Sequence, residues 1–198
     1  MKKGIYLCSF KARFPGLDIV YNDIDPNTKA DIIGDAMHVD LRPFDYVLAT
    51  PPCNYWTRAN IVCETSDYAQ KTKHLLPSML SKLAQSGKPF ILENVRNKPR
   101  MSRYHIWELV SKFGLYVYEV NRHTYFTNRM FNPWLPKMYD YWGDGYAKVS
   151  NKDLQGGGQV SKVFLQWMRT QGIIKEGGKN DGSGKAVGTL KGVSEKEG

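Results

Sequence analysis

Short apolar segments ending in Asp, Gly or Pro constrain the fold most, because they recur along the chain and alternate with stretches of helical composition. Apolar runs bounded by such residues are typical of buried strands. We expect strands over residues 4–9, 18–22, 30–33, 45–49, 89–93 and 115–120. Strands separated by helices predict an α/β fold, with a doubly wound, mostly parallel sheet.

Three helices are expected, over residues 66–85, 102–113 and 160–170. Ser66 is a candidate N-cap for the first helix and Gly87 a stop signal. Pro77 lies inside this stretch and is expected to kink it. Ligands of open α/β sheets bind at the carboxyl ends of the strands, so the residues that follow each strand are the first candidates for a site.

Residues 175–198 differ in composition from the rest of the chain. They hold seven glycines and five lysines, with no aromatic residue, and we expect a disordered tail. Residues 1–174 are expected to form one domain, with a small aromatic-rich insertion near 125–157. The tail also holds four acidic residues, so the body keeps +8 of the net charge of +9. That charge favours an anionic partner, with nucleic acid first.

Three cysteines are too few for a disulfide framework, which favours a reducing, cytoplasmic location. No run of 18 apolar residues is present, so no membrane-spanning helix is expected. We infer no obligate protein partner and no metal site.

Cys53 follows a short strand and two prolines, on a rigid turn that would point its thiol out of the sheet edge. A cysteine placed so is a candidate nucleophile. The alternative is a small buried apolar residue, which is the commonest role of a reduced cysteine.

The residues around Cys53 favour the first interpretation. The sequence Thr-Pro-Pro-Cys-Asn-Tyr-Trp-Thr (50–57) resembles the Pro-Pro-Cys-Gln-x-Phe-Ser/Thr motif of the cytosine C5-specific DNA methyltransferases. Leu-Glu-Asn-Val (92–95) is similar to the Glu-Asn-Val motif of the same family and ends the next buried strand. Both motifs occur in the family's order, and the chain looks like a short, phage-type member.

The resemblance implies a Rossmann-like methyltransferase fold, S-adenosylmethionine as cofactor, and roles for both motif residues. Cys53 would add to carbon 6 of cytosine, and Glu93 would bind the ring nitrogen 3 and the amino edge. The alternative for Glu93 is a salt bridge with Arg96 or Arg100. Among the residues near Cys53, Pro51 would contact the cofactor. Asn54 and Arg58 would contact the nucleic acid.

By the same resemblance, the cofactor site lies at the ends of the first three strands. Asp23 would bind the ribose hydroxyls, Ile24 would lie against the adenine, and Asp35 with Ala36 would bind the adenine amino group. For Asp23 and Asp25 the alternative is turn formation before Pro26. The loop after the first strand, with Cys8 and Ser9 as candidate contacts, lacks the family's glycines, and Phe10 stands at the key glycine position.

Two further segments are candidates for contacts with nucleic acid. Asn-Arg-His-Thr-Tyr-Phe (121–126) is the nearest match to the family's Gln-x-Arg-x-Arg motif. By this match, Arg122 would contact the cytosine carbonyl or a phosphate. His123 is as well explained as a polar surface residue. Eight aromatic residues lie between Tyr125 and Tyr146. Two interpretations are equally favoured. Trp134, Tyr139 and Trp142 could stack on nucleic acid bases, or the aromatic residues could form a small core under a loop.

The sequence therefore predicts methyl transfer from S-adenosylmethionine to carbon 5 of cytosine in DNA. Two alternatives stay open. One is a methyltransferase acting on cytosine in RNA or in free nucleotides. The other is a non-catalytic nucleic-acid-binding protein with a degenerate cofactor site.

Overall fold

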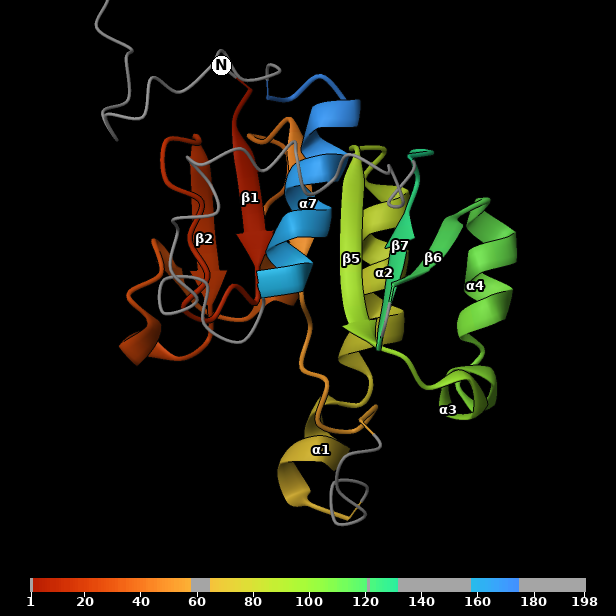
Figure 1. Cartoon of the computed structure of the whole chain (residues 1–198). Helices are drawn as coiled ribbons and strands as arrows, with labels where there is room; N and C mark the ends of the chain where they lie inside the picture. Colours follow the sequence, from red (N-terminus) through yellow and green to blue (C-terminus); the bar gives the residue numbers. More distant parts are fainter. Residues whose placement is uncertain (1, 58–64, 121, 132–157, 175–198) are drawn as a thin grey trace, which may run out of the picture.

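The computed structural model describes residues 2–57, 65–120, 122–131 and 158–174, and contains a seven-stranded, mostly parallel sheet (Figure 1). The strand order is β3-β2-β1-β4-β5-β7-β6. Only β7 is antiparallel to its neighbours β5 and β6. The strands are β1 (Gly4–Leu7), β2 (Ile19–Asp23), β3 (Ile32–Ile33), β4 (Tyr46–Ala49), β5 (Phe90–Val95), β6 (Tyr116–Val120) and β7 (His123–Thr127). The expectation of an α/β fold with a mostly parallel sheet is confirmed.

Helices cover both faces of this sheet, and alternate strand residues face each layer. On one face, Ile5 and Val47 pack with α2 (Leu75–Gln85) and α4 (Ile106–Phe113). On the other face, Tyr6 and Leu48 pack with the final helix, α7 (Gly158–Thr170). Figure 1 shows α7 in front of the sheet and α2 behind it. No helix among the described residues is long and apolar enough to cross a membrane.

Gly4 allows one close contact in the sheet. Gly4 and Tyr46 are paired on the neighbouring strands β1 and β4, and Tyr46 is only 1% exposed. A β-carbon on residue 4 would lie within 2.3–2.6 Å of the Tyr46 ring, so the ring occupies the space of the missing side chain.

The helix expected over residues 66–85 is two helices, α1 (Asp67–Thr72) and α2. Ser66 caps α1 through a bond from the Ala69 amide, as expected. The prediction of a kink at Pro77 was wrong. Pro77 lies in the first turn of α2, where a missing amide hydrogen leaves no helical bond unmade, so the break precedes it.

The prediction of a helix over 102–113 was also wrong at its start. The chain forms α3 (Lys98–Arg103), capped by Asn97, and then α4. His105, with φ +57°, separates the two helices. Strand β7 was not predicted at all, and the third strand is limited to Ile32 and Ile33.

Because β7 includes Tyr125 and Phe126, the aromatic segment begins inside the sheet. Both residues are fully buried, and Phe131 is 6% exposed and packs on Tyr118 with ring centroids 4.7 Å apart. These three aromatics therefore belong to the main core of the sheet, and they form neither a stacking surface nor a separate small core. Residues 132–157, with Trp134, Tyr139 and Trp142, lie outside the described residues, as do Arg58 and the tail.

Candidate active site

Three neighbouring parallel strands bring the predicted motifs to one edge of the sheet. Leu7 of β1 pairs with Ala49 of β4, and Ala49 pairs with Leu92 of β5. The segments that follow these residues therefore lie at the same edge of the sheet, although β5 continues to Val95 in its pairing with β7. They are the loop from Cys8, the turn containing Cys53, and the strand end containing Glu93. Helix α1 lies beyond this carboxyl edge (Figure 1).

Cys53 is an exposed thiol at the start of a tight turn. Its carbonyl accepts hydrogen bonds from the amides of Trp56 and Thr57, both at 2.9 Å. Trp56 is fully buried and Tyr55 is 5% exposed, so the far side of the turn is anchored in the core. Asn54 lies exposed beside Cys53. The turn thus presents Cys53 and Asn54 to solvent on a fixed base, and the alternative of a buried apolar cysteine is wrong.

Side chains from the end of β5 and from α3 fasten this turn. The Asn94 amide nitrogen donates to the Pro51 carbonyl at 3.0 Å, and Asn94 is fully buried. The Asn97 amide nitrogen donates to the Trp56 carbonyl at 2.8 Å. The Arg100 guanidinium donates to the carbonyls of Tyr55 and Thr57. The two motifs are therefore one hydrogen-bonded unit.

Glu93 does not pair with the arginines considered from the sequence. Arg96 forms an ion pair with Glu119 at 3.1 Å, and the Arg100 guanidinium holds the Cys53 turn. The Glu93 carboxylate, 10% exposed, instead contacts His123, with Oε1 and Nδ1 2.6 Å apart.

His123 is the residue that sequence reasoning missed. It begins β7, where it pairs with Val95, and Tyr125 pairs with Glu93 itself. Side chains alternate along a strand, so positions 123 and 125 face Glu93 and position 122 does not. Recognising residues 123–127 as a strand would have selected His123. Arg122 has an exposed side chain beside the site, and its carbonyl accepts from the Arg96 amide at 2.8 Å.

The loop after β1 has a left-handed backbone without glycine. Cys8 and Phe10 have φ values of +53° and +49°. Thr50 Oγ1 donates to the Cys8 carbonyl at 2.8 Å, and the Phe10 amide donates to Asp23 Oδ2 at 2.7 Å. Ser9 is buried between them, and its amide bonds the Asn22 carbonyl. The loop is thereby tied to both β2 and the segment after β4.

Burial raises the pKa of the Cys8 thiol to about 12, and the negative charges of Asp23 and Asp35 add to the effect. A thiol with so high a pKa carries almost no thiolate at neutral pH, so Cys8 is a poor nucleophile.

Carboxylates and exposed apolar side chains meet at the ends of β2 and β3. Asp23 accepts from the amides of Phe10 and Asp25, and Asp25 caps a short 3-10 helix (Pro26–Thr28), so turn formation accounts for Asp25. Ile24 is 70% exposed and Phe10 is 51% exposed. Asp35 caps a second 3-10 helix (Ala36–His38) whose first residue is buried.

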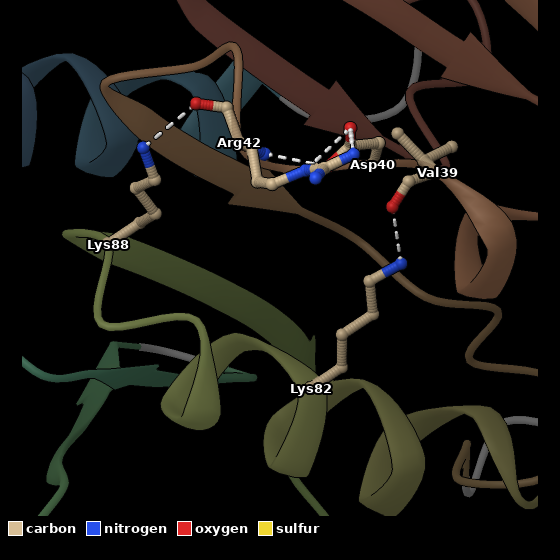
Figure 2. A network of polar contacts seen from close by, with 5 residues as sticks. All are labelled: Val39, Asp40, Arg42, Lys82 and Lys88. Carbon is tan, nitrogen blue, oxygen red and sulfur yellow. Dashed lines mark hydrogen bonds and ion pairs between the residues drawn. The ribbon is translucent and has the colours of Figure 1, made fainter.

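Lys82 of α2 fixes the segment that follows Asp35. Its ammonium donates to the carbonyls of Ala36, Met37 and Val39 at 3.0, 2.8 and 2.7 Å. Figure 2 shows Lys82 reaching the Val39 carbonyl, while Lys88 reaches the carbonyl of Arg42 further along the same loop. Burial lowers the pKa of Lys82, and the charges of Asp35 and Asp40 oppose that shift.

Tyr68 of α1 is a further residue near the edge that the sequence did not indicate. Its pKa is raised, first by burial and then by electrostatic interaction with the ionisable groups of Cys8, Asp23 and Cys53. Tyr68 is 52% exposed. Helix α1 therefore brings a phenol close to both the thiol and the end of β2.

No protein-family model matches this sequence, and no curated protein matches it either.

Proposed function

We propose that this protein methylates carbon 5 of cytosine in DNA, with Cys53 as the nucleophile and Glu93 as the group that binds ring nitrogen 3. One observation carries the proposal. An exposed thiol follows β4 and a nearly buried carboxylate lies near the end of the neighbouring parallel strand β5, and Asn94 bonds the turn of one to the strand of the other.

The chemistry requires both groups. Carbon 5 of cytosine is a poor nucleophile until the Cys53 thiolate forms a bond to carbon 6. The electron pair of the 5,6 double bond then moves through carbon 5 toward nitrogen 3, where a protonated Glu93 carboxyl would donate a hydrogen bond and stabilise the developing charge. Carbon 5 then forms its bond to the methyl group as the bond between that group and its donor breaks. Loss of the carbon 5 proton to a base finally restores the double bond and expels the thiolate.

The sheet supports the methyltransferase part of the proposal. The order 3-2-1-4-5 is that of a nucleotide-binding sheet, which binds its ligand at the carboxyl edge. Helices on both faces suit a doubly wound arrangement.

The ends of β1, β2 and β3 fit S-adenosylmethionine. The left-handed conformation of Cys8 and Phe10 is the one that glycine would favour at this loop. Asp23 would hold the ribose hydroxyls, exposed Ile24 would contact the adenine, and Asp35 with Ala36 would bind its amino group. When bound, the cofactor supplies an electrophilic methyl group.

A row of cations beside the site supports a nucleic acid substrate. We call Arg96, Lys98, Arg103 and Arg122 the basic ridge; all four are exposed and lie at or near the end of β5. Two of these cations form ion pairs with Glu119: Arg96 at 3.1 Å and Lys98 at 3.2 Å. Cations on a surface next to an active site suit phosphate contacts, while the base turns out of the stack toward Cys53.

The test is covalent trapping. A pool of random-sequence duplexes carrying 5-fluorocytosine is incubated with the protein and S-adenosylmethionine, and adducts are resolved on a denaturing gel. Fluorine at carbon 5 cannot leave as a proton, so the Cys53 adduct should persist. Cys53→Ser should abolish it. Cys8→Ser should retain it, because the high pKa of Cys8 leaves that thiol unreactive.

A matching RNA pool separates the substrates. Trapping of RNA alone would assign RNA as the substrate in place of DNA. Binding of DNA with no adduct in either pool would contradict the proposal and favour a non-catalytic nucleic-acid-binding protein.

A further inference from the structure

Glu93 and His123 form a short, largely buried side-chain contact at the carboxyl edge of the sheet. Glu93 has one side-chain partner among the described residues, the His123 ring at 2.6 Å. The Glu93 carboxylate is 10% exposed and the His123 side chain 27% exposed. A hydrogen bond so shielded from water is stronger than the same bond at the surface.

The backbone leaves this pair little freedom. Strands β5 and β7 are paired over five consecutive positions, from Ile91 with Thr127 to Val95 with His123. Glu93 and His123 lie diagonally across this ladder, at a separation that long side chains span. His123 therefore approaches the Glu93 carboxylate from a fixed direction.

A competing position for the carboxylate lies next to His123. Tyr125 is paired directly with Glu93, and its hydroxyl is buried with no hydrogen-bond partner among the described residues. A buried hydroxyl without a partner is costly, so it would donate to a carboxylate that turned toward it. Among the described residues, only His123 bonds the Glu93 side chain and holds it away from that hydroxyl.

We propose that His123 is a positioning residue for Glu93. Its Nδ1 holds Oε1 of the carboxyl group and leaves Oε2, protonated in the complex, to donate to nitrogen 3 and to accept from the amino group of cytosine. The inference depends on the proposed function, because it assigns a role within that reaction. It replaces the polar surface interpretation of His123.

The experiment measures the addition of Cys53 without the methyl donor. Reversible addition to carbon 6 makes carbon 5 basic, so in D₂O carbon 5 takes up a deuteron, loses its proton and releases the thiolate. Mass spectrometry of nucleosides from a random-sequence duplex pool then counts deuterated cytosine. The parent protein, Cys53→Ser and the variants of His123 are compared at equal DNA occupancy.

We expect His123→Leu to slow exchange about 10- to 100-fold, less than removal of an acid–base group itself. DNA affinity should not change, because His123 is not part of the basic ridge. His123→Asn should restore most of the rate, because its amide nitrogen lies near the position of Nδ1. His123→Gln, which places its amide further out, should not.

A second pair of the same kind provides the matched control. His105 and Glu108 are also 2.7 Å apart, but both are largely exposed and lie at the start of α4. Glu108→Gln should leave the exchange rate unchanged.

The outcomes separate the two proposals. No exchange in the parent would overturn the proposed function, and with it the role of His123. Exchange in the parent that is unchanged in His123→Leu would overturn the role of His123 alone. If His123→Leu does not fold, equal rates for folded His123→Asn and His123→Gln would overturn it.

Discussion

Replacing Asn94 by alanine should damage both the stability and the chemistry of the site. The substitution removes the 3.0 Å bond to the Pro51 carbonyl and the 2.9 Å bond accepted from the Val95 amide. Each buried bond contributes about 0.5–1.5 kcal/mol, and a carbonyl left unpaired in the core costs about 1–3 kcal/mol. Because Asn94 is fully buried, water does not replace the lost donor.

The expected loss is about 2–4 kcal/mol in the free energy of unfolding. For a chain of this size that corresponds to a fall of about 4–16 °C in melting temperature. The Cys53 turn also loses its link to β5. A displacement of about 1 Å at a reacting group lowers a rate by about 100-fold, so trapping of 5-fluorocytosine should slow by a similar factor.

Asn128 provides a control at the opposite edge of the sheet. Its side chain donates to the Lys88 carbonyl at 2.9 Å and accepts from the Phe90 amide at 3.1 Å. Asn128→Ala should lower the melting temperature but leave trapping unchanged well below that temperature. Equal trapping rates for the two variants, measured where both are folded, would refute the positioning role of Asn94.

Three further predictions follow from contacts elsewhere. Lys82→Met should weaken binding of S-adenosylmethionine in calorimetry, because the loop after Asp35 loses three hydrogen bonds. The control Lys88→Met removes one bond to the Arg42 carbonyl and should leave that binding unchanged. Gly4→Ala should lower the melting temperature, since its β-carbon meets the Tyr46 ring and overpacking costs about 1–3 kcal/mol; an unchanged melting temperature would contradict it. Burial raises the pKa values of Tyr6, Tyr46 and Tyr125 above their ordinary value of 10.0. Folding therefore favours protonated phenols at these three positions, so stability should be intact below about pH 10 and fall above it. On unfolding, phenolate absorbance should rise by a step that corresponds to these three tyrosines.

The strands of the parallel part were predictable because each is a short apolar run with a clear end. β1, β2, β4 and β5 fall within one or two residues of the expected ranges. Parallel neighbours end at one edge of a sheet, so the placement of Cys53 and Glu93 at the same edge was predictable too.

Strand β7 was missed because its residues give no simple pattern. His-Thr-Tyr-Phe-Thr is buried on both faces, so polar Thr124 and Thr127 lie in the interior beside Tyr125 and Phe126. Alternation of apolar and polar residues, the usual signal, is absent there. The loss of this strand hid His123, because only pairing with β5 brings it to Glu93.

The loop after β1 shows why a missing glycine is weak evidence against a cofactor site. Glycine is favoured there because it adopts positive φ without strain, but other residues reach the same backbone at about 1–3 kcal/mol each. Cys8 and Phe10 both do so, and three bonds oppose the strain: from Thr50 to the Cys8 carbonyl, from the Ser9 amide to Asn22, and from the Phe10 amide to Asp23. All three connect the loop to segments that carry proposed site residues. Strained backbone is common at ligand sites, so the strain in this loop supports the proposed cofactor site.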